Sequence, residues 1–128
     1  MHNVLIVEDQ PDIRKLIRMT LDADAYRIEE APDGDAALER LRSALPDLMI
    51  LDVMMPGSLD GIQVCAKVKG EARTARIKVI MLSARGQRAD IESGLAAGAD
   101  AYLVKPFDPI ELLDLAARLL GRDHAFGS

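Results

Sequence analysis

Charged and hydroxyl side chains follow short apolar runs at four places in this chain of 128 residues. These polar residues are Glu8 with Asp9, Asp52, Ser83 and Lys105. If the apolar runs are strands of one parallel sheet, their carboxyl ends lie along one edge, where open α/β sheets bind their ligands. We therefore predict that these side chains share one site.

The chemistry of this predicted site is that of carboxylates around a cation. Glu8, Asp9 and Asp52 converge if the first and third strands are neighbours, and like charges that close cannot all stay ionised unless a proton or a cation offsets them. Ligands that offer only oxygen atoms favour a hard cation, and Mg²⁺ keeps waters and binds readily beside phosphate. Lys105 adds a compact positive charge and Ser83 a hydroxyl donor. Together, a bound cation, an ammonium and a hydroxyl can stabilise the negative charge that is spread over phosphoryl oxygens.

Asp52 is the candidate nucleophile, because a carboxylate can become an aspartyl-phosphate with little beyond positioning and charge neutralisation. It ends the run Leu48-Met49-Ile50-Leu51, which lies between Pro46 and later turn residues. Such a run is typical of a strand that is buried on both faces. A simpler interpretation, in which Asp52 only caps the loop that follows, stays open from this run alone.

Strand-like and helix-like segments alternate along the rest of the chain. Short apolar or alternating runs predict strands over residues 3–7, 26–31, 47–52, 78–83 and 101–104. Helical spacing predicts helices over residues 11–21, between Gly34 and Pro46, over 61–69, from about 91 to Gly98 and from about 109 to 120. Five alternations predict an α/β fold, a doubly wound five-stranded parallel sheet with the flavodoxin-like strand order 2-1-3-4-5 and helices on both faces.

Length and composition narrow the class of protein. We expect one domain over residues 1–121 and a flexible C-terminal tail over residues 122–128. Cys65 is the lone cysteine and cannot form an internal disulfide, which fits a cytoplasmic protein. No apolar run approaches the ~20 residues of a membrane span. The net charge of −5 gives no electrostatic reason to expect direct nucleic-acid binding.

Five separated motifs, taken together, resemble the signature of two-component response-regulator receiver domains. They are Glu8-Asp9, Asp52 followed by Met55-Pro56, Asp60-Gly61, Ser83-Ala84 and Lys105-Pro106. The resemblance covers essentially the whole chain and is strongest to the stand-alone receivers that regulate chemotaxis. It implies a signalling switch that catalyses only its own phosphoryl transfer and hydrolysis, not an enzyme with an external substrate.

The resemblance also implies roles for the site residues. Asp52 would accept a phosphoryl group from a phosphohistidine on a sensor histidine kinase or a histidine phosphotransfer protein. Magnesium would be bound by Asp9, Asp52 and the backbone carbonyl of Met54, with Glu8 helping through water. Lys105 and Ser83 would contact the phosphoryl oxygens.

The resemblance also implies a conformational change on phosphorylation. Ser83 and Tyr102 would form the switch pair, in which the hydroxyl moves toward the phosphate and the aromatic ring turns inward. The bond before Pro106 would be cis. The sequence departs from the family pattern in one extra residue within Gly57-Ser58-Leu59, and Ser83 stands where Thr is commoner.

Three other functions are weighed against this one. A flavin-binding electron carrier of the same fold needs a Ser-, Thr- or Gly-rich phosphate loop after the first strand, where this chain has Glu8-Asp9-Gln10. A magnesium-dependent phosphohydrolase of small substrates normally has a second carboxylate two residues after the nucleophile, and Met54 is there. A receiver-like module that no longer accepts phosphate would lack one of the charged groups that are present here.

The last predicted helix carries more apolar residues than one buried stripe needs. The surplus residues, Leu112, Leu115 and Leu119, should face solvent or a partner. We predict that this surface, with the neighbouring fourth helix, docks a downstream effector, whose identity the sequence does not give, or a second copy of the chain in a homodimer.

Overall fold

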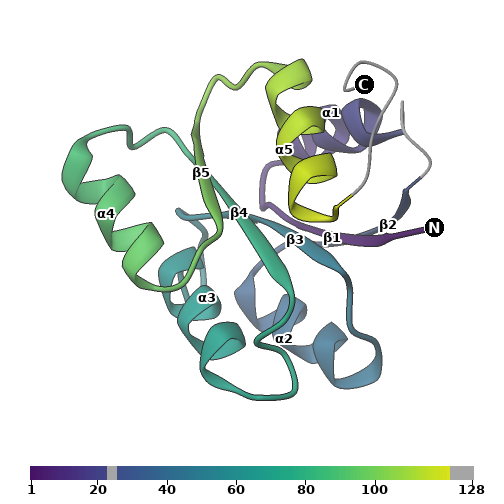
Figure 1. The fold of residues 1–128 in the computed structure, drawn as a ribbon. Helices are drawn as coiled ribbons and strands as arrows, with labels where there is room; N and C mark the ends of the chain where they lie inside the picture. The colour runs from purple at the N-terminus through teal and green to yellow at the C-terminus, as the bar shows by residue number, and fades with distance from the viewer. Residues whose placement is uncertain (23–25, 122–128) are drawn as a thin grey trace.

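The computed structural model describes residues 1–22 and 26–121, in which five strands alternate with five helices (Figure 1). The strands are β1 (Asn3–Val7), β2 (Arg27–Ala31), β3 (Leu48–Asp52), β4 (Lys78–Ser83) and β5 (Ala101–Val104). The helices are α1 (Pro11–Leu21), α2 (Gly34–Ser43), α3 (Gly61–Gly70), α4 (Arg88–Ala96) and α5 (Pro109–Leu119). The predicted tail, residues 122–128, lies outside the described residues.

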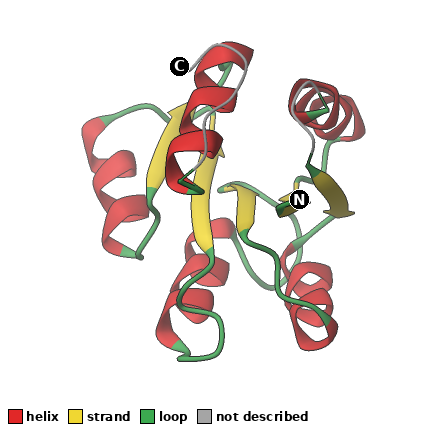
Figure 2. Ribbon diagram, turned by 45° about the vertical axis from the view of Figure 1, so that its right-hand side comes forward, coloured by secondary structure: helices red, strands yellow, loops and turns green. Residues whose placement is uncertain are grey.

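All neighbouring strands are parallel, and their order is β2-β1-β3-β4-β5, as predicted. Figure 2 shows the strands in yellow, with helices on both sides of the sheet. The chain therefore runs outward in one direction from β1 to β2 and in the other from β3 to β5. The reversal falls between β1 and β3, where Val7 pairs with Leu51. The residues after these two strand ends lie together at the switch point, where doubly wound sheets bind ligands.

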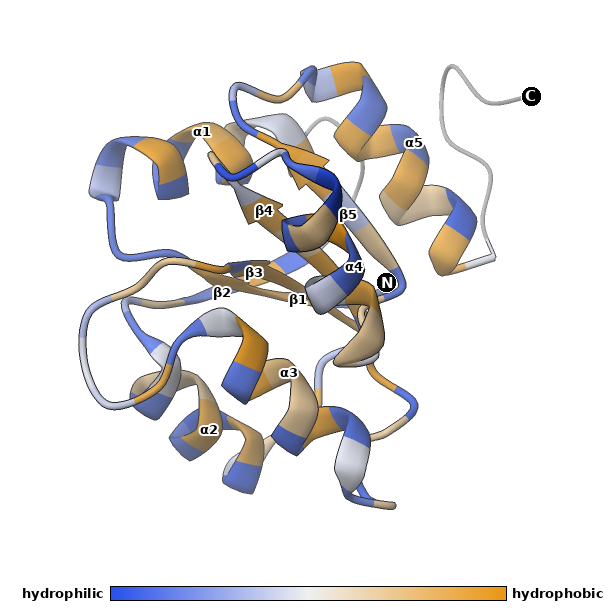
Figure 3. Ribbon diagram, turned by 90° about the vertical axis from the view of Figure 1, so that its left-hand side faces the viewer, coloured by the Kyte–Doolittle hydropathy of each residue, from blue (hydrophilic) through white to orange (hydrophobic). Residues whose placement is uncertain are grey.

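Two apolar cores lie on opposite faces of the sheet, because successive strand residues point to opposite sides. Helices α1 and α5 cover one face, and α2 and α3 cover the other, with α4 beside β5 (Figure 3). Strand β3 is buried along its whole length. A strand fixed on both faces gives Asp52, its last residue, a rigid position.

Local signals in the sequence start the helices next to the site. Pro11 is the first residue of α1, where its missing N–H costs nothing. The Asp60 carboxylate accepts a hydrogen bond from the Gln63 amide at 2.8 Å, and the Gln63 side chain accepts one from the Asp60 amide at 2.9 Å. This capping box begins α3 immediately after the loop that follows Asp52.

The loop with the extra residue is tied to α2. The Ser58 hydroxyl donates to the carboxylate of Asp35, 2.9 Å from Oδ2. Gly57 has a φ of +101°, a left-handed conformation that favours glycine. The insertion is thus accommodated by a turn at Gly57, on the side of the site that faces α2.

The prediction that Leu112 faces outward from α5 is wrong. This side chain is fully buried in the core between α5 and the sheet, and Leu115 and Leu119 are partly buried against the same core. Helix α5 packs on α1 as well as on the sheet, so its buried arc is wider than a single stripe. The exposed large apolar residue of α5 is Ile110. Within the described ranges, no helix is long and apolar enough to cross a membrane.

Candidate functional site

Three carboxylates meet at the switch point, as predicted. Glu8 and Asp9 follow β1, and Asp52 ends the neighbouring β3. One oxygen from each lies within 4.8 Å of the others. Glu8 and Asp52 are 1% and 4% exposed, whereas Asp9 is half-buried. The carboxylates are therefore held mostly out of water, with Asp9 on the solvent side.

Lys105 reaches the same cluster from the end of β5. Its Nζ atom lies 2.8 Å from Glu8 Oε1 and 3.4 Å from Asp52 Oδ1. Its backbone N–H donates to the carbonyl of Ser83 at 2.8 Å, which joins the ends of β5 and β4. The Lys105–Pro106 peptide bond is cis, as predicted.

The electrostatics of the cluster are dominated by crowded negative charge. Burial raises the pKa of Asp52 to about 7, and a hydrogen bond with Glu8 and the charge of Glu8 act in the same direction. Lys105 and the Met54 amide lower the pKa but do not offset this effect. A buried carboxyl that holds its proton near neutral pH marks a site with too little positive charge. The three carboxylates offer only oxygen ligands and lack enough positive charge around them, so the site fits a hard divalent cation such as Mg²⁺.

Backbone N–H groups orient the two buried carboxylates. The Met54 amide donates to Asp52 Oδ1 at 3.3 Å, and the Gln10 amide donates to Glu8 Oε2 at 3.2 Å. The Arg14 guanidinium donates to the backbone carbonyl of Glu8 at 2.8 Å. One oxygen of each buried carboxylate is thus held by a backbone N–H, and the other oxygen of Glu8 accepts a hydrogen bond from the Lys105 ammonium.

Ser83 and Tyr102 are connected through the backbone of one residue, Arg85. The buried Ser83 hydroxyl accepts a hydrogen bond from the Arg85 N–H at 3.0 Å, and the Tyr102 hydroxyl donates to the Arg85 carbonyl at 2.8 Å. Asp52 pairs with Leu82 across the sheet, so Ser83 follows the residue opposite Asp52. The predicted switch pair is therefore linked by a short loop beside the carboxylates.

A cleft of about 400 Å³ opens above the cluster. Its lining includes Asp9, Met54, Met55, Pro56, Asp60 and Arg85. Sequence reasoning missed Arg85, whose side chain brings a cation to an otherwise acidic cleft. Its position two residues after Ser83, in the loop at a strand end, is the signal that would have found it.

A comparison with known protein families shows the family of this chain. The chain matches the family described as "Response regulator receiver domain" over residues 4–117. The chain belongs to this family. Receiver domains are phosphoacceptor signalling modules rather than true enzymes, they are phosphorylated by histidine kinases, and they bind Mg²⁺ at an acidic pocket. In this receiver domain the acidic pocket is the cluster of Glu8, Asp9 and Asp52.

Curated relatives of this receiver domain include transcriptional regulators. The transcriptional regulatory protein ResD of Bacillus subtilis is 43% identical over 119 residues, which cover 93% of this chain and 48% of ResD. The phosphate regulon transcriptional regulatory protein PhoB of Rhizobium meliloti is 40% identical over 119 residues, covering 93% of this chain and 52% of PhoB. The chain thus spans about half the length of these relatives.

Solved structures of similar proteins match over nearly their full length. The chemotaxis protein CheY4 of Vibrio cholerae has a TM-score of 0.85 and 34% identity, covering 93% of this chain and 98% of that one. The receiver domain of the sensor histidine kinase PA1611 from Pseudomonas aeruginosa has a TM-score of 0.85 and 30% identity, covering 94% and 98%. The PA1611 structure has a magnesium ion coordinated in its active-site cleft. A flavin carrier and a phosphohydrolase are not the functions of this family.

Proposed function

We propose that Asp52 is the phosphoacceptor of a two-component signalling switch and takes its phosphoryl group from a phosphohistidine. The observation that carries this proposal is that Asp52 shares one cluster with Glu8 and Asp9 and lies beside the Lys105 ammonium. Its Oδ1 atom lies 3.4 Å from the Lys105 ammonium and accepts the Met54 N–H. Within the cluster, Asp52 is the carboxylate that ends the central, fully buried strand.

In the transfer, an oxygen of the Asp52 carboxylate attacks phosphorus while the bond from phosphorus to the donor imidazole nitrogen breaks. The electron pair of that bond returns to the imidazole, which takes up a proton from solvent. Asp52 must be ionised to attack, so the proton that its raised pKa favours has to leave first. Bound Mg²⁺, which Asp9, Asp52, Glu8 through water and the Met54 carbonyl would hold, supplies positive charge that favours this ionisation and the transferring phosphoryl group.

Lys105 and Ser83 would bind the phosphoryl oxygens once the group is on Asp52. The Lys105 ammonium has three donors and uses one on Glu8 at 2.8 Å. The Ser83 hydroxyl is available as a donor, because in the structure its oxygen accepts the Arg85 N–H. A movement of Ser83 toward phosphate would pull on the Arg85 loop and so on the carbonyl that holds Tyr102.

We infer that the output of the switch is the surface made by α4, β5 and α5, here called the output face. It holds Tyr102 and the exposed apolar side chains Leu95 and Val104, which are 46% and 39% exposed. Leu115 and Leu119 contribute only their part-exposed edges. A downstream effector or a second copy of the chain would bind this face after the Arg85 loop and the Tyr102 ring move.

The test of the proposal is phosphorylation by a small donor. Acetyl phosphate with Mg²⁺ should add one phosphoryl group to the wild type, measured by intact mass, and none to Asp52→Ala. Asp22→Ala, at an exposed aspartate outside the cluster, is the matched control and should be labelled like the wild type. Labelling of Asp52→Ala to the wild-type level would overturn the assignment, and EDTA should abolish labelling of the wild type.

A further inference from the structure

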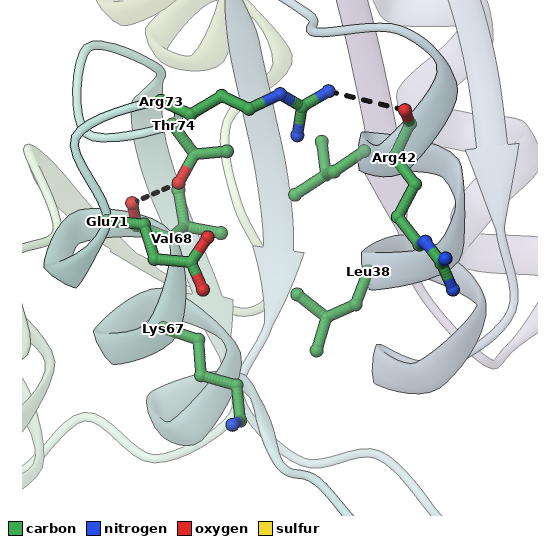
Figure 4. Close-up of a pocket in the computed structure, with 8 residues that line it drawn as sticks. Leu38, Arg42, Lys67, Val68, Glu71, Arg73 and Thr74 are labelled. Atoms are coloured by element: carbon green, nitrogen blue, oxygen red, sulfur yellow. Dashed lines mark hydrogen bonds between the residues drawn. The ribbon is translucent and has the colours of Figure 1, made fainter.

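A second hollow lies away from the carboxylates, between the C-terminal halves of α2 and α3 (Figure 4). Its volume is about 250 Å³. The apolar part of its lining is Leu38 and Leu41 from α2 and Val68 from α3. Leu41 and Val68 are buried and Leu38 is half-buried, so the floor is apolar and fixed by the core.

Three cations surround this floor. Arg42 lies in the last turn of α2, Lys67 in the last turn of α3, and Arg73 in the loop after α3. Figure 4 shows the Arg73 side chain reaching across the hollow toward α2, where it donates to the Arg42 carbonyl at 3.3 Å. Glu71 is the acidic residue of the lining. We call these side chains and the floor the α2–α3 groove.

The charge of the α2–α3 groove is opposite to that of the whole chain. Its lining has three cations and one anion, whereas the chain has a net charge of −5. In the part of the chain that the structure describes, Lys67 makes no hydrogen bond or ion pair. Arg42 contacts Glu39 at 3.4 Å, but both side chains are more than 70% exposed, so this pair is weak.

Helix dipoles explain part of this charge but not all of it. Basic residues in a last helical turn are stabilised by the helix C-terminus, which accounts for Arg42 and Lys67. Arg73 lies beyond α3, and its guanidinium crosses the mouth of the groove. Neither its place nor the apolar floor between the cations follows from a dipole effect.

We propose that the α2–α3 groove docks an acidic peptide segment of a partner protein, with one large apolar side chain on the floor and carboxylates beside the cations. The apolar floor favours a peptide over a small phosphate ester, which would leave Leu38 and Val68 uncovered. The negative net charge disfavours nucleic acid. The site requires no property of Asp52 and would serve to hold a partner during signalling.

The probe is a fluorescein-labelled peptide, EDELFEDE, titrated with the full chain at low salt and followed by fluorescence anisotropy. We expect saturable binding that weakens as salt is added, since exposed charges are screened. Replacing Leu and Phe of the peptide by Ser should weaken binding, because the apolar anchor is lost. The double variant Lys67→Gln/Arg73→Gln should weaken it about fivefold or more.

The matched control is Arg88→Gln, which removes an exposed cation on α4 far from the groove and should leave the affinity unchanged. Amide chemical-shift changes on binding should fall on α2, α3 and the loop after α3. The proposal is overturned if no saturation occurs, if Arg88→Gln weakens binding as much as the double variant, or if shifts fall on the carboxylate end of the sheet. Equally tight binding of a single-stranded DNA octamer would also overturn it.

Discussion

The Lys105 ammonium lies closer to Glu8 than to Asp52, at 2.8 Å against 3.4 Å. One lysine therefore partly neutralises two buried carboxylates. If Asp52 accepts a phosphoryl group, as proposed, Lys105 would move toward that group. Lys105 therefore has two expected roles at this site. Its pair with Glu8 would stabilise the fold, and its contact with a phosphoryl group would stabilise the proposed phosphorylated state.

Removing Lys105 should separate these two roles. Lys105→Met leaves Glu8 buried without its ion pair, so the metal-free protein should lose about 1–3 kcal/mol of unfolding free energy, measured by urea denaturation in EDTA. The same change should tighten Mg²⁺ binding, because a neighbouring positive charge is gone, yet slow phosphorylation by acetyl phosphate. Lys15→Met, at an exposed lysine, is the control and should change neither quantity. Unaltered Mg²⁺ affinity in Lys105→Met would contradict the electrostatic account.

The stability of the metal-free protein should fall as pH rises through neutrality. The folded pKa of Asp52 is about 7, above its ordinary value of 3.8, so between these values the folded state binds the extra proton. Stability from that proton is present at the low end of the range and is lost toward pH 7. Asp52→Asn should flatten the slope, and saturating Mg²⁺ should remove it. Urea denaturation from pH 5 to 8 in EDTA measures this, and a rising slope would contradict it.

Gly61 is required for the close approach of α3 to the end of β3. A Cβ at this position would collide with the carbonyl oxygen of Asp52 and lie 2.7 Å from Val53 Cα. Gly61→Ala should therefore shift the end of β3, destabilise the protein by about 1–3 kcal/mol and reduce phosphorylation. Gly70→Ala, where a Cβ meets nothing within 4 Å, is the control and should leave both unchanged or slightly raise stability.

Much of this arrangement could be predicted from the sequence, since the signals were local. The bounds of β1 and β4 match the predicted runs 3–7 and 78–83, and the polar residue at the end of each run, Glu8 after β1 and Ser83 as the last residue of β4, indicated the site. The orientation of Leu112 could not be predicted, because a single helical pattern does not show that α5 also packs on α1. The backbone link that Arg85 makes between Ser83 and Tyr102 could not be predicted either. Its N–H and carbonyl join Ser83 to Tyr102, and backbone contacts leave no trace in residue type.

Cys65 should be nearly inert toward thiol reagents in the folded protein. It is fully buried, and burial raises the pKa of its thiol to about 11, so little thiolate is present at pH 8. Reaction with a disulfide reagent should be slow in buffer and fast in denaturant, followed by absorbance. Rapid labelling of the native protein would show that the core around α3 opens readily.

The contact between Gly94 and Tyr102 provides a test of the output face. A Cβ on Gly94 would lie 2.8 Å from both Tyr102 Cδ2 and Met81 Sδ, so the ring lies directly against the α4 backbone. Gly94→Ala should displace the ring and break its hydrogen bond with the Arg85 carbonyl, because the new Cβ would overlap the ring, which is more exposed than the fully buried Met81. Phosphorylation of Asp52 should continue, since no acceptor contact changes. Tyr102 ring shifts in NMR spectra, compared with and without acetyl phosphate, measure the response. If the switch passes through Tyr102, the phosphorylation-dependent shift should shrink in Gly94→Ala and remain in Gly70→Ala, and equal shifts in the two variants would contradict this route.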